Sequence, residues 1–244
     1  MNRQQYFLNI FLKKIPVFQA VFRAVEAAGL AGYDFKEPIL DLGCGDGFFT
    51  QALLGKGKKI YGLDINIKAL NIAEKRKTYF QIVNSKANKI PFPNNYFNTI
   101  LANSSLEHIK KLRQVLKECI RILKINGSLI LTAPSEKREK YFAGNLHNKF
   151  FSHLNCWSGQ KWQKELSDLG FRKISWQYVA SRKTCFISGL FLPFAPIAWL
   201  EKKIFGHFLG YRKFTYFLVK LIFKNFNDKV KNDNGAVIII RAIK

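Results

Sequence analysis

A glycine-rich turn is the first feature of the sequence that is typical of a chemical site. The apolar run Ile39–Leu42 leads into Gly-Cys-Gly-Asp-Gly over residues 43–47, and a helix is expected to start near Phe48. Glycines let a backbone pass close to a nucleotide-like ligand, and a helix that starts there offers free N–H groups. Asp64 ends the next predicted strand, about twenty residues on, where a carboxylate can accept hydrogen bonds from both ribose hydroxyls. The pattern predicts a nucleotide-type cofactor site.

Two details distinguish this turn from a site for a nicotinamide cofactor. Phe48 occupies the position of the third glycine in the dinucleotide fingerprint. Asp41 lies inside the end of the strand, where it can face a cationic group but would repel a pyrophosphate. The turn therefore favours a cofactor that carries a positive charge near the glycines.

With these features the chain resembles the class I S-adenosylmethionine-dependent methyltransferases. It looks closest to the broad group that includes ubiquinone and menaquinone C-methylating enzymes and many small-molecule O-methyltransferases. The matching stretches follow the family's order between about residues 38 and 134, at 39–47, 62–64, 90–97, 105–109 and 118–127. The resemblance implies an α/β, Rossmann-like class I methyltransferase fold with a mostly parallel seven-stranded sheet flanked by helices.

The resemblance also implies S-adenosyl-L-methionine as the cofactor and a set of contacts along it. Asp41 would lie near the methionine ammonium, and Gly43, Cys44 and Gly45 would pass their backbone under the methionine part. Asp64 would hold the ribose. The remaining implied contacts are Ile65 packing on the adenine, Ala87 and Asn88 at the adenine edge, and Asn103 beneath the sulfonium.

Histidines are the candidates for catalysis. Methyl transfer needs mainly alignment of the nucleophile, the methyl carbon and the sulfur, and a base is needed only if the acceptor must lose a proton. His108, after the fourth core strand, is the first candidate, and a structural role at the start of the following helix is the alternative. His147 and His153, in a long loop after the next strand, are weaker candidates. No Asn-Pro-Pro-Tyr motif occurs, which disfavours DNA adenine and protein glutamine methylation.

Apolar spacing predicts the elements that position these residues. Residues 3–30 read as helix with a break near Pro16. Strands are predicted at 39–42, 59–64, 99–102, 128–133, 171–180 and 236–240, and helices from Phe48 and at 66–77, 112–123 and 160–169. This alternation is typical of a parallel sheet covered by helices. We expect a helical cap at 1–34, a core at 35–182, an insertion at 183–234 and a last core strand at 235–244.

The insertion is apolar and basic. Residues 184–200 are 17 residues without a charge but with two prolines, which favours a re-entrant or interfacial segment over a simple span. Residues 214–226 read as an amphipathic helix with Lys213, Lys220 and Lys224 on one face, which suits an anionic bilayer. The alternative is a helical cap whose apolar face is buried in protein, because the periodicity is the same.

Charge points to an anionic partner. The 244 residues include 40 Lys and Arg against 16 Asp and Glu, a net charge of +24. This favours a membrane surface, a nucleic acid or an acidic substrate, with a composition bias as the alternative. The four cysteines form no C-x-x-C pair and have no metal-ligand spacing to a histidine, so neither a disulfide framework nor a metal site is expected. No signal peptide is predicted at the N-terminus.

Together these features predict a methyltransferase that acts on an amphipathic, lipid-linked or envelope-related small molecule. We expect it to be cytoplasmic, and peripheral or monotopic at an anionic membrane surface. An RNA methyltransferase, favoured by the charge of +24, is one alternative. A cofactor-binding module with lost activity is another, because Lys86 and Asn98 replace acidic residues that the family commonly has.

Overall fold

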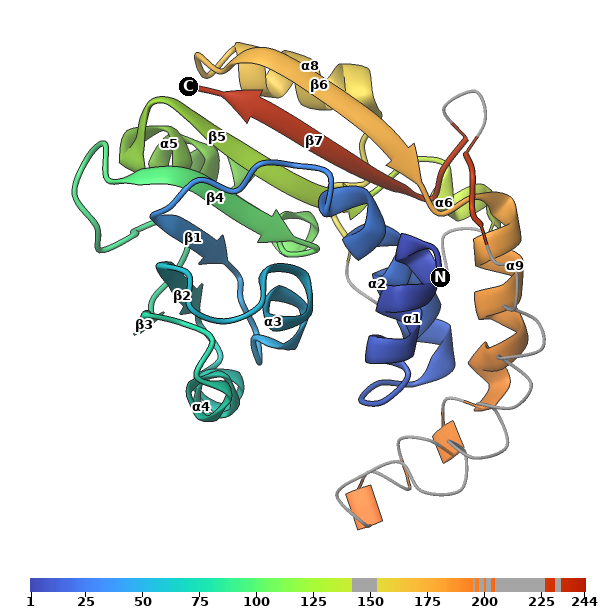
Figure 1. Ribbon diagram of the computed structural model, residues 1–244. Coiled ribbons are helices and arrows are strands. Elements are labelled where there is room, and N and C mark those ends of the chain that lie inside the picture. Colours follow the sequence, from blue (N-terminus) through green and yellow to red (C-terminus); the bar gives the residue numbers. More distant parts are fainter. Residues whose placement is uncertain (142–152, 195, 198–199, 201–202, 205–226, 231–233) are drawn as a thin grey trace.

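A seven-stranded sheet forms the centre of the molecule in the computed structural model, which describes residues 1–141, 153–194, 196–197, 200, 203–204, 227–230 and 234–244 (Figure 1). The strand order is β3-β2-β1-β4-β5-β7-β6. β7 runs antiparallel to both of its neighbours, and the other pairs are parallel. The strands are β1 (Ile39–Leu42), β2 (Ile60–Asp64), β3 (Gln81–Asn84), β4 (Phe97–Asn103), β5 (Leu123–Pro134), β6 (Arg172–Val179) and β7 (Val237–Ile243). The predicted fold class is confirmed.

Side chains alternate between the two faces of the central strands, and each face has its own helices. Ile39 packs in a cluster with residues of α2 (Val17–Leu30) and α3 (Phe48–Leu54). Leu40 and Leu42 pack in another cluster with α5 (Leu112–Ile122) and α8 (Gly159–Ser167). Both faces of β1 are buried, which explains why its sequence is a continuous apolar run around one aspartate.

The carboxyl ends of the parallel strands meet at one edge of the sheet, and this edge carries the predicted site. The glycine turn follows β1, Asp64 ends β2, and Asn103 ends β4. The short 3₁₀ helix η1 (Leu106–His108) comes just after β4. Ligands of open α/β sheets bind at this edge where the strand order reverses, and here that point lies between β1 and β4.

The N-terminal helices cover one end of this edge. The predicted helix at 3–30 is broken into α1 (Arg3–Phe11) and α2, with Pro16 as the residue before α2. α2, α1 and α9 (Arg182–Phe191) lie side by side beside the sheet (Figure 1). Their shared cluster reaches Phe48 of α3 and Val237 of β7, so the helical cap packs directly onto the core.

One strand lies outside the predicted set, and two other strands are longer than predicted. β3 was not predicted, because its four residues are only partly buried or exposed and show no apolar alternation. It is recognised only by its pairing with β2, Tyr61 opposite Gln81. β4 and β5 extend beyond the predicted 99–102 and 128–133, because Phe97 pairs with Leu123 and Asn103 with Thr132 in the ladder.

One side of the first part of the uncharged run 184–200 is buried against the protein, as the alternative of a helical cap expects. In α9 the side chains of Thr184, Cys185, Ile187, Ser188 and Phe191 are buried. The Ser188 hydroxyl donates to the carbonyl of Phe18 at 2.7 Å, which ties α9 to α2. Only the other side of α9 is open, where Phe186 and Leu190 are exposed. A second 3₁₀ helix, η2 (Leu192–Phe194), follows directly.

The predicted amphipathic helix at 214–226, with Lys213, Lys220 and Lys224, lies outside the described residues, as does His147. Within the described ranges, none of the helices has both the length and the apolar character that a bilayer span requires.

Candidate functional site

The glycine turn is held against the end of β2 by its own backbone. The N–H groups of Gly43 and Cys44 both donate to the carbonyl of Leu63, at 2.8 and 3.1 Å. Gly43 has a φ of +79°, and a Cβ there would lie 2.5 Å from the Cβ of Ser105. At Gly45 a Cβ would meet nothing within 4 Å. The turn thus needs glycine for close approach at its start and leaves open space above its centre.

Two N–H groups at the start of α3, where the sequence predicts free N–H groups, are used within the turn. The N–H of Gly47 donates to the carbonyl of Cys44 at 3.0 Å, and the N–H of Phe48 donates to Oδ1 of Asp46 at 3.0 Å. A ligand here would lie in the open space over Gly45 and contact neighbouring side chains.

Asp64 organises the turn and keeps capacity for a ligand. Its Oδ2 accepts the N–H of Gly45 at 2.8 Å, and its Oδ1 accepts the N–H of Asn66 at 2.8 Å. A carboxylate offers about four lone-pair sites, so each oxygen can still accept one more hydrogen bond. This geometry fits the two hydroxyls of a ribose, as the sequence predicts.

Asp41 is almost fully buried beneath the turn. Its Oδ2 accepts the hydroxyl of Thr50 in α3 at 2.5 Å and the hydroxyl of Tyr79 at 2.6 Å. Burial raises the pKa of Asp41 to about 6, and the two hydrogen bonds act against that rise. Asp41 therefore links β1 to α3 and to the segment before β3. Its contact with a methionine ammonium stays a prediction.

The other predicted cofactor residues occupy different environments. Ile65 is 64% exposed beside Asp64, which leaves its side chain open for a flat ring. Ala87 is half-buried and Asn88 is exposed. Cys44 is half-buried in the turn, and burial raises the pKa of its thiol, so the thiol stays protonated. These positions are compatible with the predicted roles, which no ligand contact tests.

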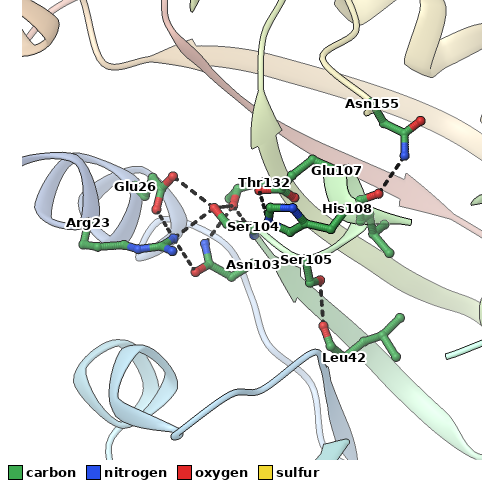
Figure 2. Close-up of polar contacts among 11 residues, drawn as sticks. Arg23, Glu26, Leu42, Asn103, Ser104, Ser105, Glu107, His108, Thr132 and Asn155 are labelled. Atoms are coloured by element: carbon green, nitrogen blue, oxygen red, sulfur yellow. Dashed lines mark hydrogen bonds and ion pairs between the residues drawn. The ribbon is translucent and has the colours of Figure 1, made fainter. Parts of the chain in front are cut away.

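Asn103 is engaged in a polar network at the ends of β4 and β5. Its Oδ1 accepts a hydrogen bond from Nη1 of Arg23 at 3.1 Å, and its Nδ2 donates to Oγ1 of Thr132 at 2.7 Å (Figure 2). Arg23 also donates to Oε2 of Glu26 at 2.7 Å and to Oγ of Ser104 at 2.9 Å. Asn103 thus anchors α2 to the sheet, and both the oxygen and the nitrogen of its side-chain amide have partners in the protein.

Arg23 and Glu26 are site residues that the sequence analysis missed. They are a charged pair at i, i+3 in a helix whose other buried positions are Val, Phe, Ala and Leu. Glu26 is 3% exposed. A charge placed on the buried stripe of an amphipathic helix is the signal that could have found them, because isolated charges are rarely buried.

A cavity of about 250 Å³ adjoins this network. Its wall combines charged and titratable groups with apolar side chains, among them Arg23, Glu26, Glu107, His108, Arg138, His153, Phe18, Phe22 and Leu192. Ser105 follows the cavity residue Ser104, and its hydroxyl donates to the carbonyl of Leu42 at 2.8 Å, at the end of β1 where the glycine turn begins (Figure 2). An acceptor in this cavity would lie next to the predicted cofactor site.

Two of the three histidine candidates meet at the cavity. The ring centroids of His108 and His153 are 5.2 Å apart. His108 is about half-exposed, with Nε2 3.9 Å from Oε1 of Glu107. Burial raises the pKa of Glu107 to about 7. The cavity therefore brings proton-accepting groups together beside the end of β4.

Comparison with known proteins identifies the part of the chain that carries the glycine turn, Asp64 and η1. Residues 40–131 match a family described as "Methyltransferase domain". This segment is a methyltransferase domain. The family resemblance that the sequence motifs indicate is confirmed for it.

The similarity to relatives with curated names extends over more residues than this domain. Malonyl-[acyl-carrier protein] O-methyltransferase from Legionella pneumophila is 32% identical over 124 residues, which is 48% of this chain and 43% of that protein. Demethylmenaquinone methyltransferase from Bacillus licheniformis is 30% identical over 150 residues, which is 59% of this chain and 62% of that protein. The chain thus spans about half the length of these relatives.

Solved structures share the fold over nearly the whole chain. A structure from Thermotoga maritima, titled as an SAM-dependent methyltransferase, covers 93% of this chain and 91% of its own, with a TM-score of 0.67 and 17% identity. Phosphoethanolamine N-methyltransferase 2 from Haemonchus contortus covers 99% of this chain and 56% of its own, with a TM-score of 0.59 and 16% identity. These likenesses show that the fold is shared with known methyltransferase structures.

Proposed function

We propose that the protein is an S-adenosyl-L-methionine-dependent methyltransferase that acts on an amphipathic, lipid-linked or envelope-related small molecule at a membrane surface. The cofactor part is supported by the methyltransferase domain at 40–131 and by the fit of the turn and Asp64 to a ribose-bearing ligand. A structural neighbour from Haemonchus contortus is titled as a complex with S-adenosyl-L-methionine, which supports the same assignment.

The chain's own residues supply positioning in this proposal. When bound, the cofactor supplies an electrophilic methyl group on a sulfonium. Asp64 holds the ribose, the glycine turn passes under the methionine part, and the cavity walled by α2 and η1 holds the acceptor. Alignment of the two contributes most of the acceleration. For a hydroxyl acceptor, His108 would take the proton, and His108→Ala should then lower turnover about a hundredfold while cofactor binding persists.

A strip of exposed apolar side chains is the observation that carries the choice of acceptor. It runs from α9 through η2 and beyond, and it consists of Phe186, Leu190, Leu192, Phe194, Ile197, Leu200 and Ile204. Leu192 belongs both to this strip and to the wall of the cavity. Contiguous exposed apolar surface commonly marks a membrane or ligand contact. A substrate with an apolar tail could lie along the strip with its head in the cavity.

Several relatives are named for related chemistry. Demethylmenaquinone methyltransferase and ubiquinone biosynthesis O-methyltransferase are among them. These names refer to quinone pathways, whose intermediates combine a polar ring with an apolar chain. They support an amphipathic acceptor for this protein.

Vesicle flotation tests the membrane part of the proposal. The wild type should float with anionic liposomes, and high salt should weaken the attachment without abolishing it, because apolar insertion and charge attraction act together. Phe186→Ser is expected to weaken binding by about tenfold, because it removes the burial of one large apolar side chain. The matched control is Phe80→Ser, since Phe80 is also 66% exposed but lies outside the strip.

Three outcomes separate the alternatives. Equal loss in the two Phe variants, or a wild type that stays at the bottom of the gradient, would contradict the membrane surface. Steeply salt-dependent binding to RNA, with no flotation, would favour an RNA methyltransferase. Binding of S-adenosylhomocysteine without methyl transfer to any acceptor would favour the cofactor-binding module with lost activity.

Product analysis tests the acceptor class. The protein is incubated with isotope-labelled cofactor and a cell-envelope extract, and the products are analysed by mass spectrometry. Label should enter an organic-extractable, chain-bearing molecule, and Asp64→Ala should reduce its incorporation. Label found only in RNA or in water-soluble products would rule out the proposed acceptor.

A further inference from the structure

Three side chains that commonly bind metals meet in the wall of the cavity, although the sequence spacing predicts no metal site. They are Glu107 and His108 of η1, and His153 from the segment before α8. One potential ligand atom from each residue lies within 4.8 Å of the other two. We propose that Glu107, His108 and His153 bind a divalent first-row transition-metal cation.

The fold builds this arrangement by docking one segment on the other. The N–H groups of Leu154 and Asn155 both donate to the carbonyl of Glu107, at 2.7 and 3.2 Å. Nδ2 of the Asn155 side chain also donates to the carbonyls of Leu106 and Ile109, at 2.9 Å each. Four hydrogen bonds therefore fix the segment that follows His153 to η1. They hold His153 beside His108 although the two lie far apart in the sequence.

Glu107 gives a second, independent indication of a ligand. It is 2% exposed, and within the described part of the chain its Oε2 has no hydrogen-bond partner. A buried polar atom without a partner costs about 1–3 kcal/mol. A cation bound at this oxygen would remove that cost. Arg23, the nearby cation in the network, is already paired with Glu26 at 2.7 Å.

The chemistry of the donors selects the cation. Two imidazoles and one carboxylate suit Zn²⁺, Co²⁺, Ni²⁺ or Fe²⁺, whereas Mg²⁺ and Ca²⁺ prefer oxygen ligands. Arg138 lines the same cavity, and its positive charge repels a cation. Only a cation that bonds strongly to the three donors would therefore stay bound. Metal bonds of about 2.0–2.2 Å require the donor atoms to approach more closely, which rotation of the half-exposed His108 ring allows.

Three protein ligands leave coordination positions that open toward the cavity. Water or an oxygen or nitrogen atom of a bound molecule would fill them. The inference goes beyond the proposed methyl transfer, since cation binding can be measured on the protein without cofactor or acceptor. In the metal-bound protein His108 is a ligand, so the role of proton acceptor proposed for it belongs to the metal-free protein.

Titration of the chelator-stripped protein with Co²⁺ tests the site. A bound Co²⁺ with imidazole ligands gives visible absorption, so we expect a saturable band from a single cation per chain. Zn²⁺ should displace it, and millimolar Mg²⁺ should not. Glu107→Gln, His108→Gln and His153→Gln should each weaken binding by at least about tenfold.

Two controls keep the test decisive. Glu165→Gln removes a carboxylate that pairs with Arg113 on α5, and Gln19→Ala removes a cavity side chain that is not a ligand, so both should bind Co²⁺ as the wild type does. His153 is only half-buried, so its variant should keep the fold, which thermal unfolding checks. Binding that is unchanged in His153→Gln, or absent in the wild type, would overturn the proposal. S-adenosylhomocysteine titration of the same samples tests the proposed function separately.

Discussion

The ion pair between Arg23 and Glu26 gives the sharpest prediction about stability. The change is Arg23→Met, which keeps most of the apolar stem and removes the guanidinium. Nη1 of Arg23 contacts Glu26, Asn103 and Ser104, at 2.7, 3.1 and 2.9 Å. The variant leaves the carboxylate of Glu26, whose side chain is 4% exposed, without this cation.

The magnitude follows from burial. Removing one partner of a buried ion pair costs about 3–5 kcal/mol, because a buried charge is left uncompensated. The Arg23 side chain is 34% exposed, so water screens part of the effect. We therefore expect a loss of about 2–4 kcal/mol in the free energy of unfolding. For a chain of this size that is a fall in Tm of roughly 5–15 °C.

Urea unfolding of a double-mutant cycle measures this effect. Glu26→Gln in the Arg23→Met background should recover part of the loss, with a coupling energy of about 0.5–3 kcal/mol. Arg113→Met is the matched control, because its partners Glu165 and Asp168 lie at the surface and the change should cost less than about 1 kcal/mol. If Arg23→Met costs no more than Arg113→Met, or if the two changes at 23 and 26 are additive, the pair does not stabilise the cap.

Three further predictions concern the glycine turn and its neighbours. Asp64→Ala should weaken S-adenosylhomocysteine binding by about 1–3 kcal/mol in calorimetry, and unchanged affinity would contradict the ribose contact. Gly43→Ala should lower the free energy of unfolding by about 2–4 kcal/mol, because a Cβ would lie 2.5 Å from the Cβ of Ser105; Gly55→Ala, also at positive φ but with nothing within 4 Å, should cost less. The pKa of Asp41 is raised from 3.8 to about 6, so its contribution to stability is complete below pH 3.8 and is lost as the pH rises through 6. Between pH 4 and 7 the wild type should thus lose about 2 kcal/mol relative to Asp41→Asn in urea unfolding, and parallel pH profiles would refute this.

The placement of the glycine turn beside Asp64 could be predicted from the sequence because it depends on neighbouring segments. The turn at 43–47 is contiguous, and Asp64 ends the strand next to it in the sheet. Buried strands such as β1 and β7 are apolar runs, so they were found without knowledge of their partners. β3 has no such pattern, and its assignment depends on a ladder with β2 that only the three-dimensional structure shows.

The cavity beside α2 and η1 could not be predicted in the same way because its residues come from separate segments. Arg23 lies in α2, Glu107 in η1, and Arg138 in α6 (Arg138–Tyr141), while His153 precedes α8. His108 and His153 were singled out individually, but nothing in their spacing indicates that four hydrogen bonds bring their segments together.

The uncharged run 184–200 was ambiguous for a different reason. A helix that caps a protein and a helix that lies on a bilayer have the same apolar periodicity. α9 has both kinds of face, since Ile187 and Phe191 pack in the protein while Phe186 and Leu190 are exposed. Only the position of α2 decides which face is covered.

The chain leaves and re-enters the sheet at neighbouring positions around the α9 region. The N–H of Ala236 donates to the carbonyl of Ala180 at 2.8 Å, and Val179 pairs with Val237 in the antiparallel ladder. Lengthening a loop whose ends are already joined costs little, about 0.6 kcal/mol per doubling. A chimera that carries a segment of different length between these residues should therefore keep the sheet, because the ladder holds the two ends of the segment together.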